Sequence, residues 1–191
     1  MTKPKVPAGR VQLLLIALVF FGPLILATWL YFSDSGFRPD GKTNHGQLLL
    51  PMLNIGEALP GASIHEHNDG HWLLVYSNSG ACGEACENAL FTLRQSRLML
   101  GKEMDRLLRV FLHGDTRPDT VFIAEEHAGL ITLRDSNLSG LLDNKRPEEL
   151  AARGYFLIDP LGNLVMYFRA DIDPSEMVED IERLLKLSRI G

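Results

Sequence analysis

The stretch that decides the fold is WLLVYSNSGACGEAC, residues 72–86. Its first part, Trp72–Tyr76, is a near-continuous apolar run, which is typical of a strand buried on both faces. After a loop at residues 78–81, apolar residues recur at spacings that are sums of three and four, as on one face of a helix: Leu90, Leu93, Leu100, Met104 and Leu107. We expect this helix to begin between Cys82 and Cys86. The sequence therefore predicts a buried strand followed by a long helix that starts at two cysteines.

The segments on either side of this unit extend the sheet. Residues 108–112 (LRVFL) predict the next strand, and a strand, a helix and a strand in this order imply a right-handed parallel crossover. Upstream, the tight turn Asn68-Asp69-Gly70 separates residues 62–67 from residues 71–77, which predicts a β-hairpin. We thus expect a parallel pair of strands with an added N-terminal hairpin.

The C-terminal part predicts a hairpin and a helix. Residues 155–158 and 164–168 are two short apolar runs around the turn at 159–163. Asp173 is the expected N-cap of the last helix, with Pro174 at its first position and an apolar face at Met177, Ile181, Leu184 and Leu185. Between residues 118 and 150 we expect a short helix through Glu125 and Glu126, a strand at 130–133 and a helix over 148–152. This order of elements is that of an α/β, thioredoxin-like fold.

A membrane anchor is expected in front of this domain. Residues 11–32 carry no charge, and about 20 apolar residues suffice to cross a bilayer. Lys3, Lys5 and Arg10 precede the run, so the positive-inside rule places residues 1–10 in the cytoplasm and the rest on the extracytoplasmic, periplasmic side of the inner (plasma) membrane. A cleaved signal peptide is the alternative, but the run is long for one and no A-x-A site follows it. We expect a single transmembrane helix at 11–32, a linker at 33–46 and the thioredoxin-like domain at 47–191.

The overall composition excludes several classes of protein. The chain has 191 residues, a net charge of −5 and two cysteines. Without the three basic residues that precede the apolar run, 16 basic residues face 24 acidic ones, and the exported part has a net charge of −8. An acidic domain without a basic run does not favour nucleic-acid binding. Two cysteines are too few for a disulfide-rich scaffold, and neither a phosphate-binding loop nor a hydrolase motif is present.

The cysteine pair is the candidate reactive site. A helix N-terminus stabilises a thiolate, which favours Cys82 as the attacking thiol and leaves Cys86 to resolve. Glu84 and Glu87 raise the thiol pKa by repulsion, so a strongly oxidising pair is not expected. In a regular helix the Cβ atoms of residues i and i+4 are about 5–6 Å apart, whereas a disulfide needs about 3.5–4.5 Å. A bond therefore requires Cys82 to lie in the loop before the helix, which Gly80 and Gly83 permit.

Two other interpretations of the pair remain open from the residues alone. Two thiolates one helical turn apart also suit Cu(I), which prefers sulfur ligands. A purely structural disulfide is the third possibility, although so short a loop gains little stability from closure.

The segment 72–86, the strand that ends in residues 111–115 (FLHGD) and the closing segment 155–163 (YFLIDPLGN) together resemble the Sco/SenC family over roughly residues 47–188. The resemblance implies a membrane-anchored, thioredoxin-like protein that serves cytochrome c oxidase assembly, by carrying copper on C-x-x-x-C and a distant histidine or by reducing the cysteines of the oxidase copper site. Cys82 and Cys86 match the family's cysteines. Its histidine, expected shortly before residue 155, is missing from residues 149–154, and Gly83 replaces its usual proline.

The histidines provide weaker candidates. His113 ends the strand beside the cysteine loop and is a candidate metal ligand with Cys82 and Cys86, or a proton carrier. His65 and His67, on alternate positions of the expected strand, could share a metal ion. His127 has little to support a function, and ordinary solvated histidines are the simpler explanation for all of them.

These observations lead to three hypotheses. The first is a membrane-anchored thiol–disulfide exchange protein that acts on a respiratory oxidase subunit, with Cys82 and Cys86 as the catalytic residues. The second is a Cu(I) carrier in which both thiolates, with His113 as a substitute ligand, hold the metal without turnover. The third is a non-catalytic assembly scaffold in which the cysteines are dispensable.

Overall fold

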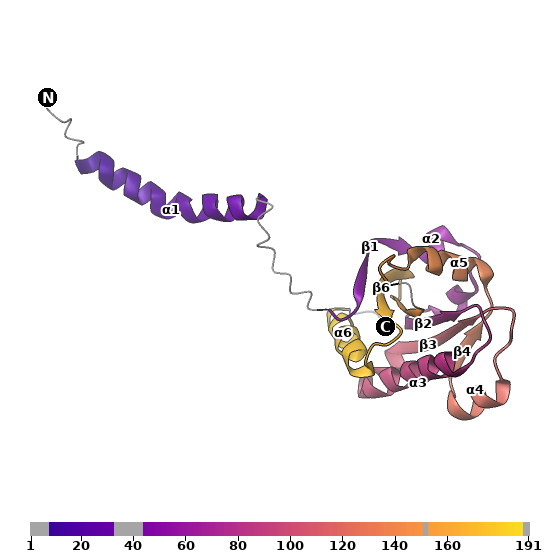
Figure 1. Cartoon of the computed structure of the whole chain (residues 1–191). Coiled ribbons are helices and arrows are strands. Elements are labelled where there is room, and N and C mark those ends of the chain that lie inside the picture. Colours follow the sequence, from indigo (N-terminus) through magenta and orange to yellow (C-terminus); the bar gives the residue numbers. More distant parts are fainter. Residues whose placement is uncertain (1–7, 33–43, 151–152, 189–191) are drawn as a thin grey trace. The chain divides into compact units, whose positions relative to one another are not determined.

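The computed structural model describes residues 8–32, 44–150 and 153–188, and it divides the chain into two units, Met1–Thr43 and Asn44–Gly191 (Figure 1). The first unit contains α1 (Ala8–Phe32), with Pro23 inside it. Residues Val11–Leu30 of α1 form the one helix of the described residues that is long and apolar enough to span a membrane. Most of the expected linker at 33–46 lies outside the described residues.

The second unit is built on a six-stranded mixed sheet with the order β1-β6-β5-β2-β3-β4. The strands are β1 (Gln47–Asn54), β2 (Trp72–Asn78), β3 (Leu107–His113), β4 (Leu130–Leu133), β5 (Gly154–Ile158) and β6 (Asn163–Arg169). The strands β2, β3 and β4 are parallel neighbours. The remaining neighbours, β2 with β5, β5 with β6, and β6 with β1, pair in antiparallel fashion. The carboxyl ends of β2, β3 and β4 consequently lie along one edge of the sheet.

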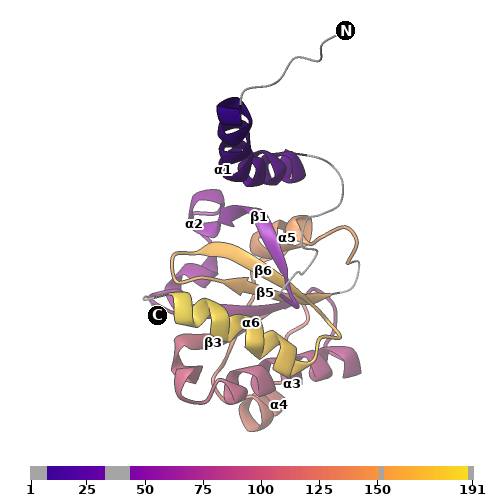
Figure 2. The same ribbon diagram turned by 90° about the vertical axis from the view of Figure 1, so that its left-hand side faces the viewer.

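Helices cover both faces of this sheet, as Figures 1 and 2 show. The longer helices α3 (Glu84–Met99) and α6 (Pro174–Leu187) pack on one face and share a core with Leu74, Tyr76 and Phe111. On the other face lie α5 (Ser136–Lys145), the single turn α2 (Ile55–Ala58) and the 3-10 helix η1 (Ser63–His67), around Leu73, Val75 and others. Because β2 contributes alternate side chains to both cores, all seven of its residues are buried.

The thioredoxin-like α/β fold predicted from the sequence is confirmed. The strand at 72–77, the parallel strand after the long helix, the strand at 130–133 and the hairpin of β5 and β6 are all present. The last helix begins where the capping residues predicted, since the Asp173 carboxylate accepts a hydrogen bond from the Ser175 N–H and Pro174 occupies the first turn. A short helix, α4 (Thr120–Glu126), passes through Glu125 and Glu126.

The predicted N-terminal hairpin is wrong in its first strand. Residues 63–67 form η1 rather than a strand; its N-cap, Ala62, and its residue Ile64 are buried. The alternation of apolar and polar residues arises because the 3-10 helix turns the side chains of Ala62 and Ile64 toward the core. The Asp135 carboxylate holds the first turn of η1 by accepting hydrogen bonds from the Ser63 N–H and hydroxyl. The added strand is instead β1, which pairs with β6 at the edge of the sheet.

Two helix predictions also need correction. The long helix ends at Met99. Of the apolar residues that follow, Leu100 is its C-cap, Met104 lies in the 3-10 helix η2 (Gly101–Arg106) and Leu107 begins β3. The helix expected over 148–152 is a turn at Glu148 and Glu149, while Ala151 and Ala152 lie outside the described residues. The helix of this region is α5, which begins at Ser136 because the Asp135 carboxylate accepts a hydrogen bond from the Leu138 N–H.

Asp135 therefore joins α5 to η1, and Asp135→Ala is expected to lower the free energy of unfolding by about 1–2 kcal/mol. Partial burial raises the pKa of this carboxyl, but the hydrogen bonds from Leu138 and Ser63 outweigh burial and hold the pKa below its ordinary value. The carboxylate's stabilising effect is thus fully present above pH ~3.9 and is lost as the pH falls through the lower pKa of the folded state. Urea unfolding of the full chain in detergent between pH 2 and 7 measures both effects.

Asp173 provides the matched control. It also caps a helix, α6, but among the residues that the structure describes its carboxylate bonds only to Ser175. A loss from Asp135→Ala no greater than that from Asp173→Ala would contradict the structural role of the link to Ser63.

Candidate functional site

The two cysteines form a disulfide at the carboxyl end of β2. Cys82 and Cys86 are joined with a Cα–Cα distance of 5.1 Å. Gly83 is the N-cap of α3 and has extended backbone angles, so Cys82 lies in the loop before the helix while Cys86 lies in its first turn. This arrangement is the one that the C-x-x-x-C spacing requires for a bond. Residues 79–83 are called the cysteine loop below.

The cysteine loop is held at its base by β2 and β3. The Asn78 side chain accepts a hydrogen bond from the Gly80 N–H at 3.0 Å, and the carbonyl of Asn78 accepts one from the Gly114 N–H at 3.1 Å. A Cβ atom on Gly114 would lie 2.1 Å from the Ser79 carbonyl oxygen. The residue after β3 must therefore be glycine for the two loops to pack this closely.

The two sulfur positions differ in exposure. Cys86 is 3% exposed and belongs to the core between the sheet and α3, whereas Cys82 is half-buried and packs against the edge of that core. An incoming molecule can consequently reach Cys82 rather than Cys86. The N-terminus of α3, which favours a thiolate, adjoins both, and the exposed Glu84 and Glu87 in its first turn oppose that effect.

Arg153 lies against the cysteine loop, which the sequence did not predict. Its guanidinium acts on the Tyr76 hydroxyl, and one of its nitrogens lies 3.7 Å from the Cβ position of Gly80. Burial raises the pKa of Tyr76, and the positive charge of Arg153 partly opposes this rise. In the sequence, Arg153 could have been linked to the cysteine loop only through its position: it directly precedes β5, and β5 pairs with β2, the strand that leads into the loop. A permanently protonated guanidinium at this place is a hydrogen-bond donor and not a metal ligand.

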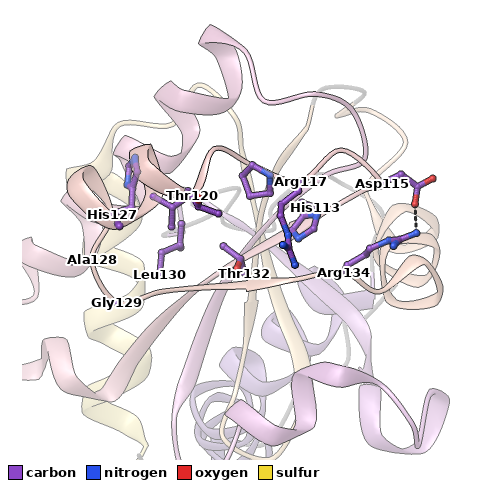
Figure 3. Close-up of a pocket in the computed structure, with 13 residues that line it drawn as sticks. His113, Asp115, Arg117, Thr120, His127, Ala128, Gly129, Leu130, Thr132 and Arg134 are labelled. Carbon is purple, nitrogen blue, oxygen red and sulfur yellow. Dashed lines mark hydrogen bonds and ion pairs between the residues drawn. The ribbon is translucent and has the colours of Figure 1, made fainter.

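His113 lies one strand away from the cysteine loop. It pairs in register with Asn78, is 9% exposed, and its Nδ1–H donates a hydrogen bond of 2.7 Å to the Gly114 carbonyl. Because Nδ1 donates this hydrogen bond, Nε2 remains available to accept a hydrogen bond or to bind a metal ion. Figure 3 shows His113 in the wall of a pocket at the carboxyl ends of β3 and β4.

Three of the other histidines are held by local contacts. His65 Nε2 donates to the Leu59 carbonyl, and His71 Nδ1 donates to the Asp69 carbonyl. His127 is buried against the edge of the Phe122 ring, and burial together with the charges of Arg94 and Arg109 lowers its pKa. Within the described part of the chain, no three His, Cys, Asp or Glu side chains form a group that could hold a metal ion.

Comparison with protein families matches both units. The family described as "Transmembrane-like, thioredoxin-like, C-terminal domain" matches residues 72–188, and "Transmembrane-like, N-terminal domain" matches residues 4–34. The chain belongs to the transmembrane-like, thioredoxin-like family. These matches support a membrane anchor followed by a thioredoxin-like domain. A comparison with curated proteins gives no match.

Several of the solved structures similar to this family member are Sco proteins. The apo Sco1 solution structure from Thermus thermophilus has 14% sequence identity and a TM-score of 0.53, covering 74% of this chain and 96% of that one. Yeast Sco1 has 17% identity and a TM-score of 0.52, covering 64% and 84%. Copper-bound ScoI from Arabidopsis thaliana has 17% identity and a TM-score of 0.50, covering 64% and 89%. The Sco-like resemblance is confirmed at the level of the fold.

Proposed function

We propose that this membrane-anchored, thioredoxin-like protein exchanges thiols and disulfides with a client outside the cytoplasm, and that the client is a cysteine pair of a respiratory oxidase copper site. The observation that carries the exchange is the disulfide between an accessible Cys82 and a buried Cys86 at the start of α3. The three basic residues that precede the apolar run at 11–32 support the extracytoplasmic side for the domain. The Sco-like fold supports the oxidase as client.

The proposed reaction transfers two electrons from the reduced pair to a client disulfide. The Cys82 thiolate attacks one client sulfur, so that a mixed disulfide forms and the other client sulfur leaves as a thiolate. Cys86 then loses its proton and attacks the Cys82 sulfur, which releases the second client thiolate and forms the Cys82–Cys86 bond. A dithiol reductant must restore the pair after each cycle.

The environment of the pair supports a reducing role. The carboxylates of Glu84 and Glu87 oppose a strongly lowered thiol pKa, and such thiols do not form a strongly oxidising disulfide. Arg153 supplies one compensating positive charge at the cysteine loop. We therefore expect Cys82 to be the more reactive of two moderately reactive thiols.

Copper transport is the second candidate, because ScoI from Arabidopsis thaliana and Sco1 from yeast are described with copper bound. The donors fit Cu(I) only in part. Reduction of the disulfide would free two thiolates, but Arg153 stands directly before β5, where the Sco/SenC resemblance calls for a histidine, and it offers no ligand.

An anaerobic Cu(I) competition titration of the reduced full chain in detergent separates these candidates. We expect binding at least tenfold weaker than that of Arg153→His, which supplies an imidazole beside the cysteine loop. Cys82→Ser/Cys86→Ser is the control for binding elsewhere. One tightly bound equivalent in the unmodified chain, lost in the control, would replace thiol exchange with copper transport and make His113 the next residue to test.

A further inference from the structure

Two adjoining pockets run along the sheet edge that also carries the cysteine loop. The first, of about 720 Å³, lies between the ends of β3 and β4 and helix α4, and Figure 3 shows His127 at one end of it and the Asp115–Arg134 ion pair at the other. The second, of about 640 Å³, continues toward α5. Both are lined by His113, Asp115 and Arg134, so they share a wall. The two pockets together are called the edge groove.

The edge groove reaches the redox site. Its second pocket is lined by Ser79 and Gly114, the two residues whose backbones pack together at the base of the cysteine loop. Ser79 is three residues before Cys82. A peptide whose sulfur is bonded to Cys82 would therefore have the edge groove within reach of its neighbouring residues, since an extended chain spans about 3.3–3.6 Å per residue.

The first pocket of the edge groove carries a net positive charge in an acidic domain, whereas the second pocket adds the carboxylate of Asp143. Arg117 and Arg134 line the first pocket with a single acidic residue, Asp115. Among the arginines whose side chains the structure describes, Arg117 stands out because no hydrogen bond, ion pair or electrostatic partner is found for it. The others bond to carboxylates or carbonyls or, for Arg153, interact electrostatically with the Tyr76 hydroxyl. The exported part has a net charge of −8, so an arginine without a partner is unusual in it.

The remaining groups of the edge groove suit an anion as well. The Arg134–Asp115 pair, with a separation of 2.6 Å, is exposed on both sides, and such pairs contribute little and exchange partners readily. Thr120 and Thr132 add hydroxyl donors to the first pocket.

We infer that the edge groove binds a carboxylate of the thiol substrate, through Arg117 and Arg134, and so selects acidic peptides for exchange at Cys82. Carboxylates are the anionic groups that a peptide client presents, and guanidinium groups bind them in paired hydrogen bonds. The inference rests on the proposed thiol exchange and specifies its substrate class. The carboxylate belongs either to an Asp or Glu near the client cysteine or to a small thiol peptide such as glutathione.

Reduction of matched disulfide peptides by the full chain in detergent tests this inference. Two peptides differ only in carrying Asp or Asn two residues from the cysteine, and oxidised glutathione is the small-molecule arm. We expect the KM of the Asp peptide to be about fivefold lower than that of the Asn peptide, with kcat unchanged, because one exposed charged pair contributes about this much to binding. In Arg117→Gln/Arg134→Gln this preference disappears. Arg169→Gln is the control, because Arg169 is similarly exposed, pairs with Asp171 and lies at the same sheet edge, opposite Gly154, but lines neither pocket.

The outcomes separate this inference from the proposed function. Equal KM values for the two peptides in the unmodified chain would overturn the edge groove as a carboxylate site while leaving thiol exchange intact. A second measurement uses the same peptides with Ser in place of Cys, titrated onto the oxidised chain. Arginine-dependent binding of the Ser–Asp peptide, without reduction of any disulfide peptide, would keep the carboxylate site and reject exchange. A KM for oxidised glutathione that rises in Arg117→Gln/Arg134→Gln would show that the edge groove also binds the carboxylates of small thiol peptides.

Discussion

Cys82→Ser is expected to abolish thiol exchange completely, because Cys82 is the sulfur that a client can reach. Cys86 is buried in the core against α3 and cannot replace it as the attacking group. The measurement is the rate at which the reduced full chain reduces a small disulfide, compared with the unmodified chain. We expect a fall to the background rate of the solution.

Cys86→Ser is expected to behave differently from Cys82→Ser. Its Cys82 still attacks, but no second thiol resolves the product, so a mixed disulfide between Cys82 and the client accumulates. Non-reducing electrophoresis followed by mass spectrometry identifies this mixed disulfide. The variant Cys82→Ser/Cys86→Ser is the control for client that is retained without a bond to either cysteine. Equal trapping by both single variants would contradict the assignment of the two roles.

Gly114→Ala is expected to have the second largest effect, because its new methyl group would lie 2.1 Å from the Ser79 carbonyl oxygen. The methyl group and the carbonyl oxygen are attached to segments that β2 and β3 hold in place. Either the cysteine loop or the segment after β3 must therefore move. We expect a loss of about 1–3 kcal/mol in the free energy of unfolding. The displaced cysteine loop should also change the rate at which Cys82 is alkylated in the reduced chain.

Gly61→Ala is the matched control for this substitution. A Cβ atom on Gly61 meets nothing within 4 Å, and the backbone there does not have a positive φ. Its stability should be unchanged or slightly raised, and alkylation of Cys82 should be unaffected. If Gly114→Ala is as neutral as Gly61→Ala, the close packing of the two loops does not position the disulfide.

The elements that the sequence predicted correctly are those with a strong local signal. The β2 strand is apolar along its whole length, and α6 has both a capping residue and a regular apolar face. The cysteine geometry was predictable too, since the C-x-x-x-C spacing permits a disulfide only when Cys82 lies outside the helix. These signals depend on neighbours in the sequence, which is why they needed no knowledge of the tertiary structure.

The errors occurred where tertiary contacts decide. Residues 63–67 alternate like a strand, but the Asp135 carboxylate, 72 residues away, holds them as a 3-10 helix. The apolar periodicity after Met99 continued through a helix end into β3, because residues of different elements can share one core. Neither fact is visible in local patterns.

The site was predicted only in part for the same reason. Cys82 and Cys86 are recognisable because they follow a buried strand, whereas Arg153 and Arg117 reach the sheet edge from loops without any motif. Arg153 becomes meaningful only through the pairing of β5 with β2, and Arg117 only through the pocket between β3, β4 and α4.

Reversible reduction of the Cys82–Cys86 disulfide tests the central claim most directly. The full chain in detergent is equilibrated with mixtures of reduced and oxidised dithiothreitol, its free thiols are alkylated, and the two forms are counted by mass spectrometry. We predict one reversible two-electron transition in which the domain stays folded in both states, as an exchange site requires. A disulfide that resists every mixture, or whose reduction unfolds the domain, would identify it as a structural bond and contradict thiol exchange.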